Sequence, residues 1–145
     1  MASSTTVKVS GLKDLGERMK GLSADVNRRI GRAAVAAGAK VIADAAKTKA
    51  PVATGNLRKN IITKRLPPGE SDLTSEYIVT VRKGKITKKQ KDRGLKDAYY
   101  ARYVEFGTAK TPAQPFLRPA YDENKEKAVE AIKDRIATRL AKAGA

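Results

Sequence analysis

The sequence contains no cysteine, no histidine and no tryptophan. Without cysteine the chain forms no disulfide and offers no thiolate nucleophile, and without histidine it lacks the usual imidazole base and the commonest zinc ligand. No apolar run approaches the roughly eighteen residues of a membrane-spanning helix, and the first residues lack the apolar core of a signal peptide. These absences predict a protein that makes no membrane contact and stays in the cell that produces it.

Motifs for catalysis and cofactor binding are also missing. The glycines form no phosphate-cradling loop, and the serines and threonines have no histidine partner. Paired carboxylates such as Asp122 and Glu126 have the spacing of a solvated helix face. We therefore predict that the protein is not an enzyme and has no catalytic residue, no cofactor and no metal site.

Positive charge is what the sequence has in excess. Lysine and arginine total 31 against 15 acids, a formal net charge of +16. Such a field attracts polyanions: nucleic acid, anionic lipid or an acidic protein face. The length of 145 residues and the 41% hydrophobic content suit one globular domain over residues 1–145. We expect a flexible terminus at 1–6, a basic loop at 82–96 and a frayed end at 143–145.

Aromatic residues are scarce and concentrated in residues 99–122, which hold four of the five tyrosines and both phenylalanines. The mixture of aromatic and β-branched residues in 99–106 favours a strand, although its first half is also compatible with a helical turn. Gly107 permits a tight turn. A final helix is predicted over 116–142, because its apolar residues recur every four positions: Ala128, Ile132, Ile136 and Leu140.

The first half of the chain is mainly helical in its pattern. Val7 to Val9 alternates as a short strand does, and helical spacing follows from Leu12 to Met19. Ser23 is a predicted N-cap for a long amphipathic helix over residues 24–49. The two interior glycines of that helix, Gly31 and Gly38, indicate either close packing or a kink.

The middle of the chain reads as a small sheet. Pro51 ends the long helix, Gly55 turns the chain, and an extended segment begins at Leu57. Residues 77–81 are the clearest strand, and an antiparallel partner precedes them. The predicted fold class is α+β, with a small antiparallel sheet packed against a long helix of the N-terminal half and a long C-terminal helix.

The run at 82–96 has eight basic residues and one acid, a local charge of +7. We interpret it as a long, solvated and mobile loop or as a distorted hairpin. Its side chains are candidates for contact with DNA or an acidic partner: Arg82, Lys83, Lys85, Lys88, Lys89, Lys91, Arg93 and Lys96.

Glu105 is the exceptional acid, since it lies between Val104 and Phe106 in an apolar stretch. A carboxylate in such a place needs a partner, and we expect Arg102, Arg118 or a basic group on a neighbouring subunit to supply it.

Two stretches together carry a resemblance: APVATGNLRKNI at 50–61 and YYARYVEFGTAKTPAQPFLRPAYD at 99–122. With the opening VKVSGLKDL, they resemble the tail-completion or neck family of long-tailed double-stranded DNA bacteriophages. The resemblance implies an α+β structural protein of the virion, made in the host cytoplasm and located in the neck or tail. It implies a turn motif of Pro51, Thr54, Gly55, Leu57 and Arg58. It also implies a core and subunit-contact motif of Tyr103, Val104, Glu105, Phe106, Gly107, Thr108, Pro115, Phe116, Leu117, Arg118 and Pro119.

The partners implied by the resemblance are other copies and other virion proteins. We expect a homo-oligomeric ring of six copies, or alternatively twelve. The ring would join the head-closure or connector protein to the tail-terminator or tail-tube protein, with double-stranded DNA in its lumen contacted without sequence specificity. The alternative from charge alone is a non-enzymatic basic protein that binds double-stranded DNA, although no helix-turn-helix pattern supports it.

Overall fold

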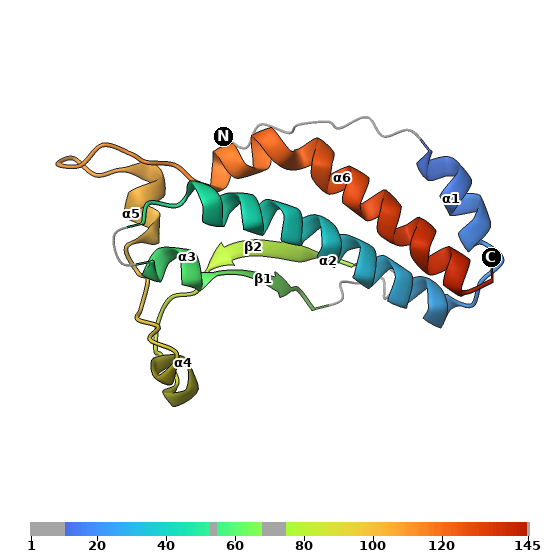
Figure 1. Ribbon diagram of the computed structural model, residues 1–145, viewed down its shortest axis with the longest axis horizontal. Helices are drawn as coiled ribbons and strands as arrows, with labels where there is room; N and C mark the ends of the chain where they lie inside the picture. Colours follow the sequence, from blue (N-terminus) through green and yellow to red (C-terminus); the bar gives the residue numbers. More distant parts are fainter. Residues whose placement is uncertain (1–10, 53–54, 68–74, 145) are drawn as a thin grey trace.

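The computed structural model describes residues 11–52, 55–67 and 75–144. Two long helices dominate it: α2 (Ala24–Lys49) and α6 (Leu117–Lys142) run side by side in opposite directions (Figure 1). A hairpin of β1 (Ile61–Arg65) and β2 (Tyr77–Val81) packs against α2. The predicted α+β class is therefore confirmed.

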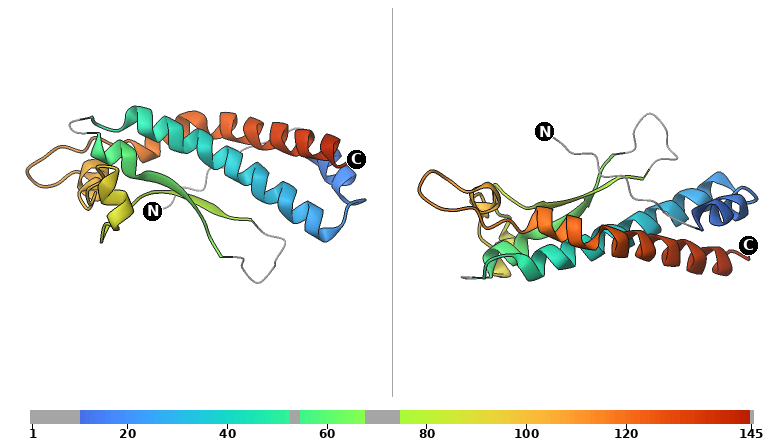
Figure 2. Two further views of the ribbon diagram at one scale, coloured as in Figure 1. Left: turned by 60° about the horizontal axis from the view of Figure 1, so that its bottom comes forward. Right: turned by 90° about the horizontal axis from the view of Figure 1, so that it is seen from above.

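The hairpin is antiparallel, and Ile61 faces Val81 at one end while Arg65 faces Tyr77 at the other. Figure 2 shows that its two strands run at an angle to the helix pair. The strand predicted for 77–81 and its antiparallel partner are confirmed. The strand predicted at 7–9 lies outside the described residues.

Helix α2 begins where the sequence predicts. The side-chain oxygen of Ser23 accepts a hydrogen bond from the Val26 N–H at 3.3 Å, which satisfies one of the free donors at the helix start. The preceding helix α1 (Leu12–Met19) is confirmed and packs Leu15 against Ile30 of α2 and Leu140 of α6.

Gly38 explains why α2 tolerates an interior glycine. A Cβ at this position would lie 2.7 Å from Ile132 Cγ1 and 3.2 Å from the Ala128 carbonyl oxygen of α6. The glycine thus permits close approach of the two long helices. At this position the explanation is therefore close packing and not a kink. Gly31 has no such tight contact.

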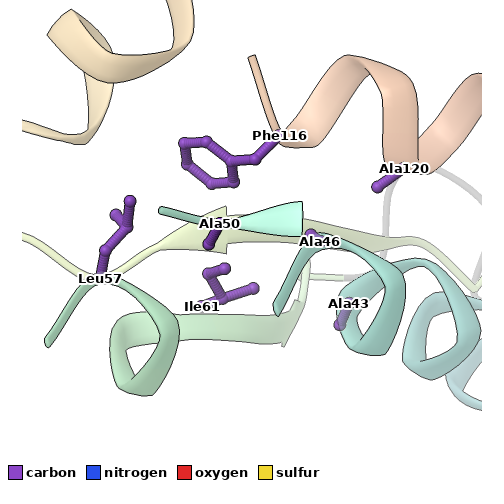
Figure 3. Close-up of a cluster of buried hydrophobic side chains, with 7 residues drawn as sticks. All are labelled: Ala43, Ala46, Ala50, Leu57, Ile61, Phe116 and Ala120. Atoms are coloured by element: carbon purple, nitrogen blue, oxygen red, sulfur yellow. The ribbon is translucent and has the colours of Figure 1, made fainter. Parts of the chain in front are cut away.

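The main core lies where α2, α3 (Asn56–Asn60), β1 and the start of α6 meet (Figure 3). Phe116 is fully buried there, and its ring points towards Leu57 and Ala50. Small residues on the facing helices complete the cluster: Ala43, Ala46 and Ala120. The aromatic-rich stretch therefore contributes one large side chain to the core and the alanines allow the helices to close around it.

Three local expectations were wrong. Leu57 does not begin an extended segment, because residues 56–60 form α3 and the strand begins at Ile61. The region 99–106 is not a strand, since Ala101–Phe106 is helix α5. The basic run is not wholly a loop, because Lys88–Asp92 is the short helix α4.

Each correction has a local physical cause. In α3, the Asn60 side-chain amide donates to the Asn56 carbonyl oxygen at 2.8 Å, a bond that only a helical turn allows. In α5, helical spacing turns Tyr100, Ala101 and Val104 together towards the core. Strand alternation would place Tyr100 and Ala101 on opposite faces.

Candidate functional site: the basic arm and the α5–α6 corner

We call residues 82–96 the basic arm. It projects from the end of the hairpin, and α4 forms its tip (Figure 1). Helix α4 is stabilised by a capping box: Thr87 Oγ1 accepts from the Gln90 N–H at 3.3 Å, and Gln90 Oε1 accepts from the Thr87 N–H at 3.0 Å. Near the C-terminal end of the arm, the side chain of Leu95 is buried.

The base of the basic arm is held at both ends by α3. The Arg82 N–H donates to the Asn60 carbonyl oxygen at 2.8 Å where the arm begins. Where it ends, Lys96 donates its N–H to Asn56 Oδ1 at 2.9 Å, and its carbonyl oxygen accepts from Asn60 Nδ2 at 3.1 Å. Because Asn56 and Asn60 are buried, these bonds are shielded from water and fix the geometry of the base.

Two further bonds close this base. The Gly84 N–H donates to Asp97 Oδ1 at 2.9 Å and so joins the two ends of the arm. Asn56 Nδ2 donates to the Tyr100 hydroxyl at 3.1 Å, which connects the base to the residue preceding α5. The arm is therefore a projecting segment on a fixed base, which differs from the unanchored loop predicted from the sequence.

The predicted contact side chains of the arm are displayed to solvent. All are exposed except Arg82, which is half-buried. None forms an ion pair with another described residue. Seven exposed cations are Lys83, Lys85, Lys88, Lys89, Lys91, Arg93 and Lys96. This arrangement can neutralise an extended anion.

The second predicted site is the corner where α5 passes into α6. Gly107 ends α5 with φ 76° and ψ 174°, a backbone conformation open almost only to glycine. A Cβ there would lie 2.8 Å from the Ala113 backbone nitrogen. The returning loop is fixed by the Gln114 N–H, which donates to the Val104 carbonyl oxygen at 2.8 Å.

Glu105 has a role that the sequence analysis missed. Its carboxylate accepts three backbone hydrogen bonds at the start of α6, from the N–H groups of Phe116 at 2.7 Å, Leu117 at 3.0 Å and Arg118 at 3.0 Å. A negative charge at a helix N-terminus also complements the helix dipole. Neither the Arg102 nor the Arg118 side chain pairs with the carboxylate, so that part of the expectation was wrong, because backbone donors satisfy it. A basic partner on a neighbouring subunit stays a prediction.

The predicted core and contact motif divides into two groups. Phe116 is buried and Val104 and Leu117 are half-buried against the core. Tyr103 and Phe106 instead remain 54% and 77% exposed. The remaining members are exposed at Thr108, Pro115 and Arg118 and half-buried at Glu105, Gly107 and Pro119.

Two exposed members of the motif, Tyr103 and Phe106, lie three residues apart on one face of α5. Tyr99, which precedes α5, is also exposed. We call these three residues the aromatic face. An exposed cluster of this kind is typical of a protein contact surface.

The turn motif positions α3 and the buried asparagines. Gly55 adopts φ 74° at the start of α3, and its carbonyl oxygen accepts from the Lys59 N–H at 3.1 Å. Leu57 is buried in the core, and Arg58 Nε donates to the Lys47 carbonyl oxygen at 2.8 Å. Pro51 is half-buried, and Thr54 lies outside the described residues.

Comparison with known protein families matches residues 13–107 to the family described as "Bacteriophage HK97-gp10, putative tail-component". The match covers α1 to α5, the hairpin and the whole basic arm. The chain belongs to this family. The matched region ends at Gly107, so it includes most of the VEFGT element and stops before PFLRPA. No curated protein and no solved structure matches the chain.

Family membership makes the protein a bacteriophage tail component, and it places its partners among other phage tail proteins. A structural component of this kind implies a non-enzymatic protein. None of the helices in the described ranges is long and apolar enough to span a membrane. The same residues contain no group of three or more acidic side chains arranged for a metal ion.

Proposed function

We propose that the protein forms a homo-oligomeric ring of six or twelve copies in the phage neck. The ring joins the head connector to the tail tube and surrounds the DNA passage, as a tail-completion component. Membership of a tail-component family supports the virion location. The basic arm is the observation that carries the proposal, because it displays seven exposed cations on an anchored base.

In a ring, several copies of the arm would add up to a large positive charge around the lumen. Double-stranded DNA carries about one negative charge per 1.7 Å of its axis, and contacts to phosphates need no particular base sequence. Several copies of the arm directed towards a lumen would surround DNA with positive charge. Contact between copies is assigned to the aromatic face, which is left in water in the single subunit.

Assembly is tested by measuring the mass of the purified protein free of nucleic acid and by negative-stain microscopy. We expect rings in the wild type, and we expect Tyr103→Ser with Phe106→Ser to shift the protein to single subunits without unfolding it. Both side chains are mostly exposed, so their loss removes little core packing. A wild-type protein that stays monomeric at all concentrations and binds DNA would favour the alternative of a basic DNA-binding protein.

The arm is tested separately by changing five of its lysines to glutamine: Lys83, Lys85, Lys88, Lys89 and Lys91. Affinity for double-stranded DNA should fall at least tenfold at low salt, and its dependence on salt concentration should become shallower, because fewer counterions are released. The matched control changes five exposed lysines elsewhere: Lys13, Lys40, Lys110, Lys127 and Lys142. Equal DNA binding by the two variants would contradict the role of the arm.

A further inference from the structure

An apolar groove of about 690 Å³ lies between the hairpin and α6, with α2 as its floor. The hairpin contributes Tyr77 and Val79, and α6 contributes Val129 and Ile132. From α2 the floor is formed by Val35, Gly38, Ala39 and Ile42. A groove of this composition is costly to leave in water, which favours an occupant with apolar side chains.

The β2 strand presents a free edge beside the groove. The Leu66 N–H donates a hydrogen bond to the Glu76 carbonyl oxygen at 2.9 Å. The Arg82 N–H donates one to the Asn60 carbonyl oxygen at 2.8 Å. With the observed register, the hydrogen-bonded pairs of the hairpin therefore fall at even-numbered residues. The backbone groups of Tyr77, Val79 and Val81 then point away from β1. No hydrogen bond joins these groups to another part of the chain that the structure describes.

We propose that residues 5–9 of the same chain occupy the groove and pair with the free edge of β2 as a third strand. The described chain begins at Gly11, and a Cβ on Gly11 would lie 3.5 Å from Lys133 Cε. Lys133 directly follows Ile132, a residue that lines the groove. The described chain therefore begins beside α6, one residue beyond the last α6 residue that lines the groove.

The length of the segment is sufficient. Residues 1–10 in an extended conformation reach roughly 33 Å. The α6 stretch along the groove, residues 117–132, is about 23 Å long. Residues 1–10 are therefore long enough to span the groove.

The direction of the strand follows from the same landmarks. Ser75, which precedes β2, lies next to Gly31 near the first half of α2. Gly11 lies at this end of the molecule too, because α1 packs Leu15 against Ile30. A chain arriving at Gly11 thus runs towards the start of β2, which makes the pairing antiparallel.

Apolar and polar residues alternate in Val7, Lys8 and Val9, and this alternation selects the register of the proposed strand. When Val7 lies opposite Val79 and Val9 opposite Tyr77, both valines face the groove and Lys8 faces solvent opposite Ile78. A shift by one residue would place Lys8 in the groove and both valines in water. The proposal does not depend on ring formation, because every group it uses belongs to one chain.

Disulfide trapping tests both the occupant and the register, because the natural chain contains no cysteine. Lys8 and Ile78 would form a non-hydrogen-bonded pair with Cα atoms about 4.5 Å apart, within disulfide range. We expect Lys8→Cys with Ile78→Cys to form a disulfide within one chain at least tenfold faster than the control pair, Val7→Cys with Ile78→Cys. In the control pair the two side chains point to opposite faces.

The chain mass on non-reducing gels separates the outcomes. A disulfide between two chains would overturn the proposal by showing that a second copy occupies the groove. Equal rates for the two pairs would overturn the register. Hydrogen exchange tests the proposal without any cysteine substitution. The amide hydrogens of Tyr77 and Val79 should exchange at least tenfold faster in a chain that lacks residues 1–9 than in the full chain. Equal exchange in the two proteins would also overturn the proposal.

Discussion

The basic arm and the α5–α6 corner follow one another in the chain, but they are held in different ways. The corner is fixed along its length, by Glu105 at the start of α6, by the backbone hydrogen bond from Gln114 to Val104 and by Phe116 in the core. The arm is fixed mainly at its base, where Asn56 and Asn60 bind Lys96. We infer that changes in the corner act on folding, while changes along the exposed part of the arm act on binding.

Removing the Phe116 side chain should have the largest effect. Phe116→Ala leaves a cavity where α2, α3 and α6 meet, and such truncations cost about 3–5 kcal/mol. The free energy of unfolding in urea measures the loss. Phe106→Ala is the control, since a side chain that is 77% exposed should cost less than about 1 kcal/mol. Similar losses for the two variants would contradict the assignment of Phe116 to the core.

Substitutions of two glycines with positive φ, Gly107 in the corner and Gly84 in the arm, allow the two regions to be compared directly. Gly107→Ala adds a contact of 2.8 Å with the Ala113 backbone to the strain at φ 76°, and we expect a cost of about 3 kcal/mol. Gly84→Ala at φ 96° meets no atom within 4 Å, so only the backbone strain of about 1–2 kcal/mol remains. Thermal unfolding of both variants measures the difference. Equal costs would show that the packing of the corner adds nothing.

Replacing Glu105 should have a smaller effect. Glu105→Ala leaves three backbone N–H groups at the start of α6 without their acceptor, at a cost of about 1–3 kcal/mol. Glu126→Ala is the control, because that side chain is exposed in the middle of α6 and should change stability by less than about 0.5 kcal/mol. Faster amide exchange at Leu117 in the Glu105 variant alone would locate the effect at the helix start.

Sequence patterns were sufficient for the long helices, for β2 and for the charge of the arm. The apolar repeat in α6, the N-cap Ser23 of α2 and the alternation in β2 each depend on neighbours within a few residues, so they can be identified without a structure. The eight cations of the arm are likewise visible in the sequence. The family was identified correctly from motifs, and the match from residue 13 to 107 confirms it.

Long-range contacts decided the rest. The sequence around α5 combines strand propensity with helical spacing, and the choice depends on burying Tyr100 and Val104 against a core built by distant segments. Glu105 reads as an acid in need of a cation, yet its partners are backbone groups eleven to thirteen residues away that only the turn at Gly107 brings close. Asn56 and Asn60 give no sequence signal, because their bonds to Lys96 span about forty residues. Local periodicity therefore determined the two long helices and β2. Tertiary packing determined the helical state of α5 and which polar groups hold the elements together, since a hydrogen-bond partner distant in the sequence leaves no local pattern.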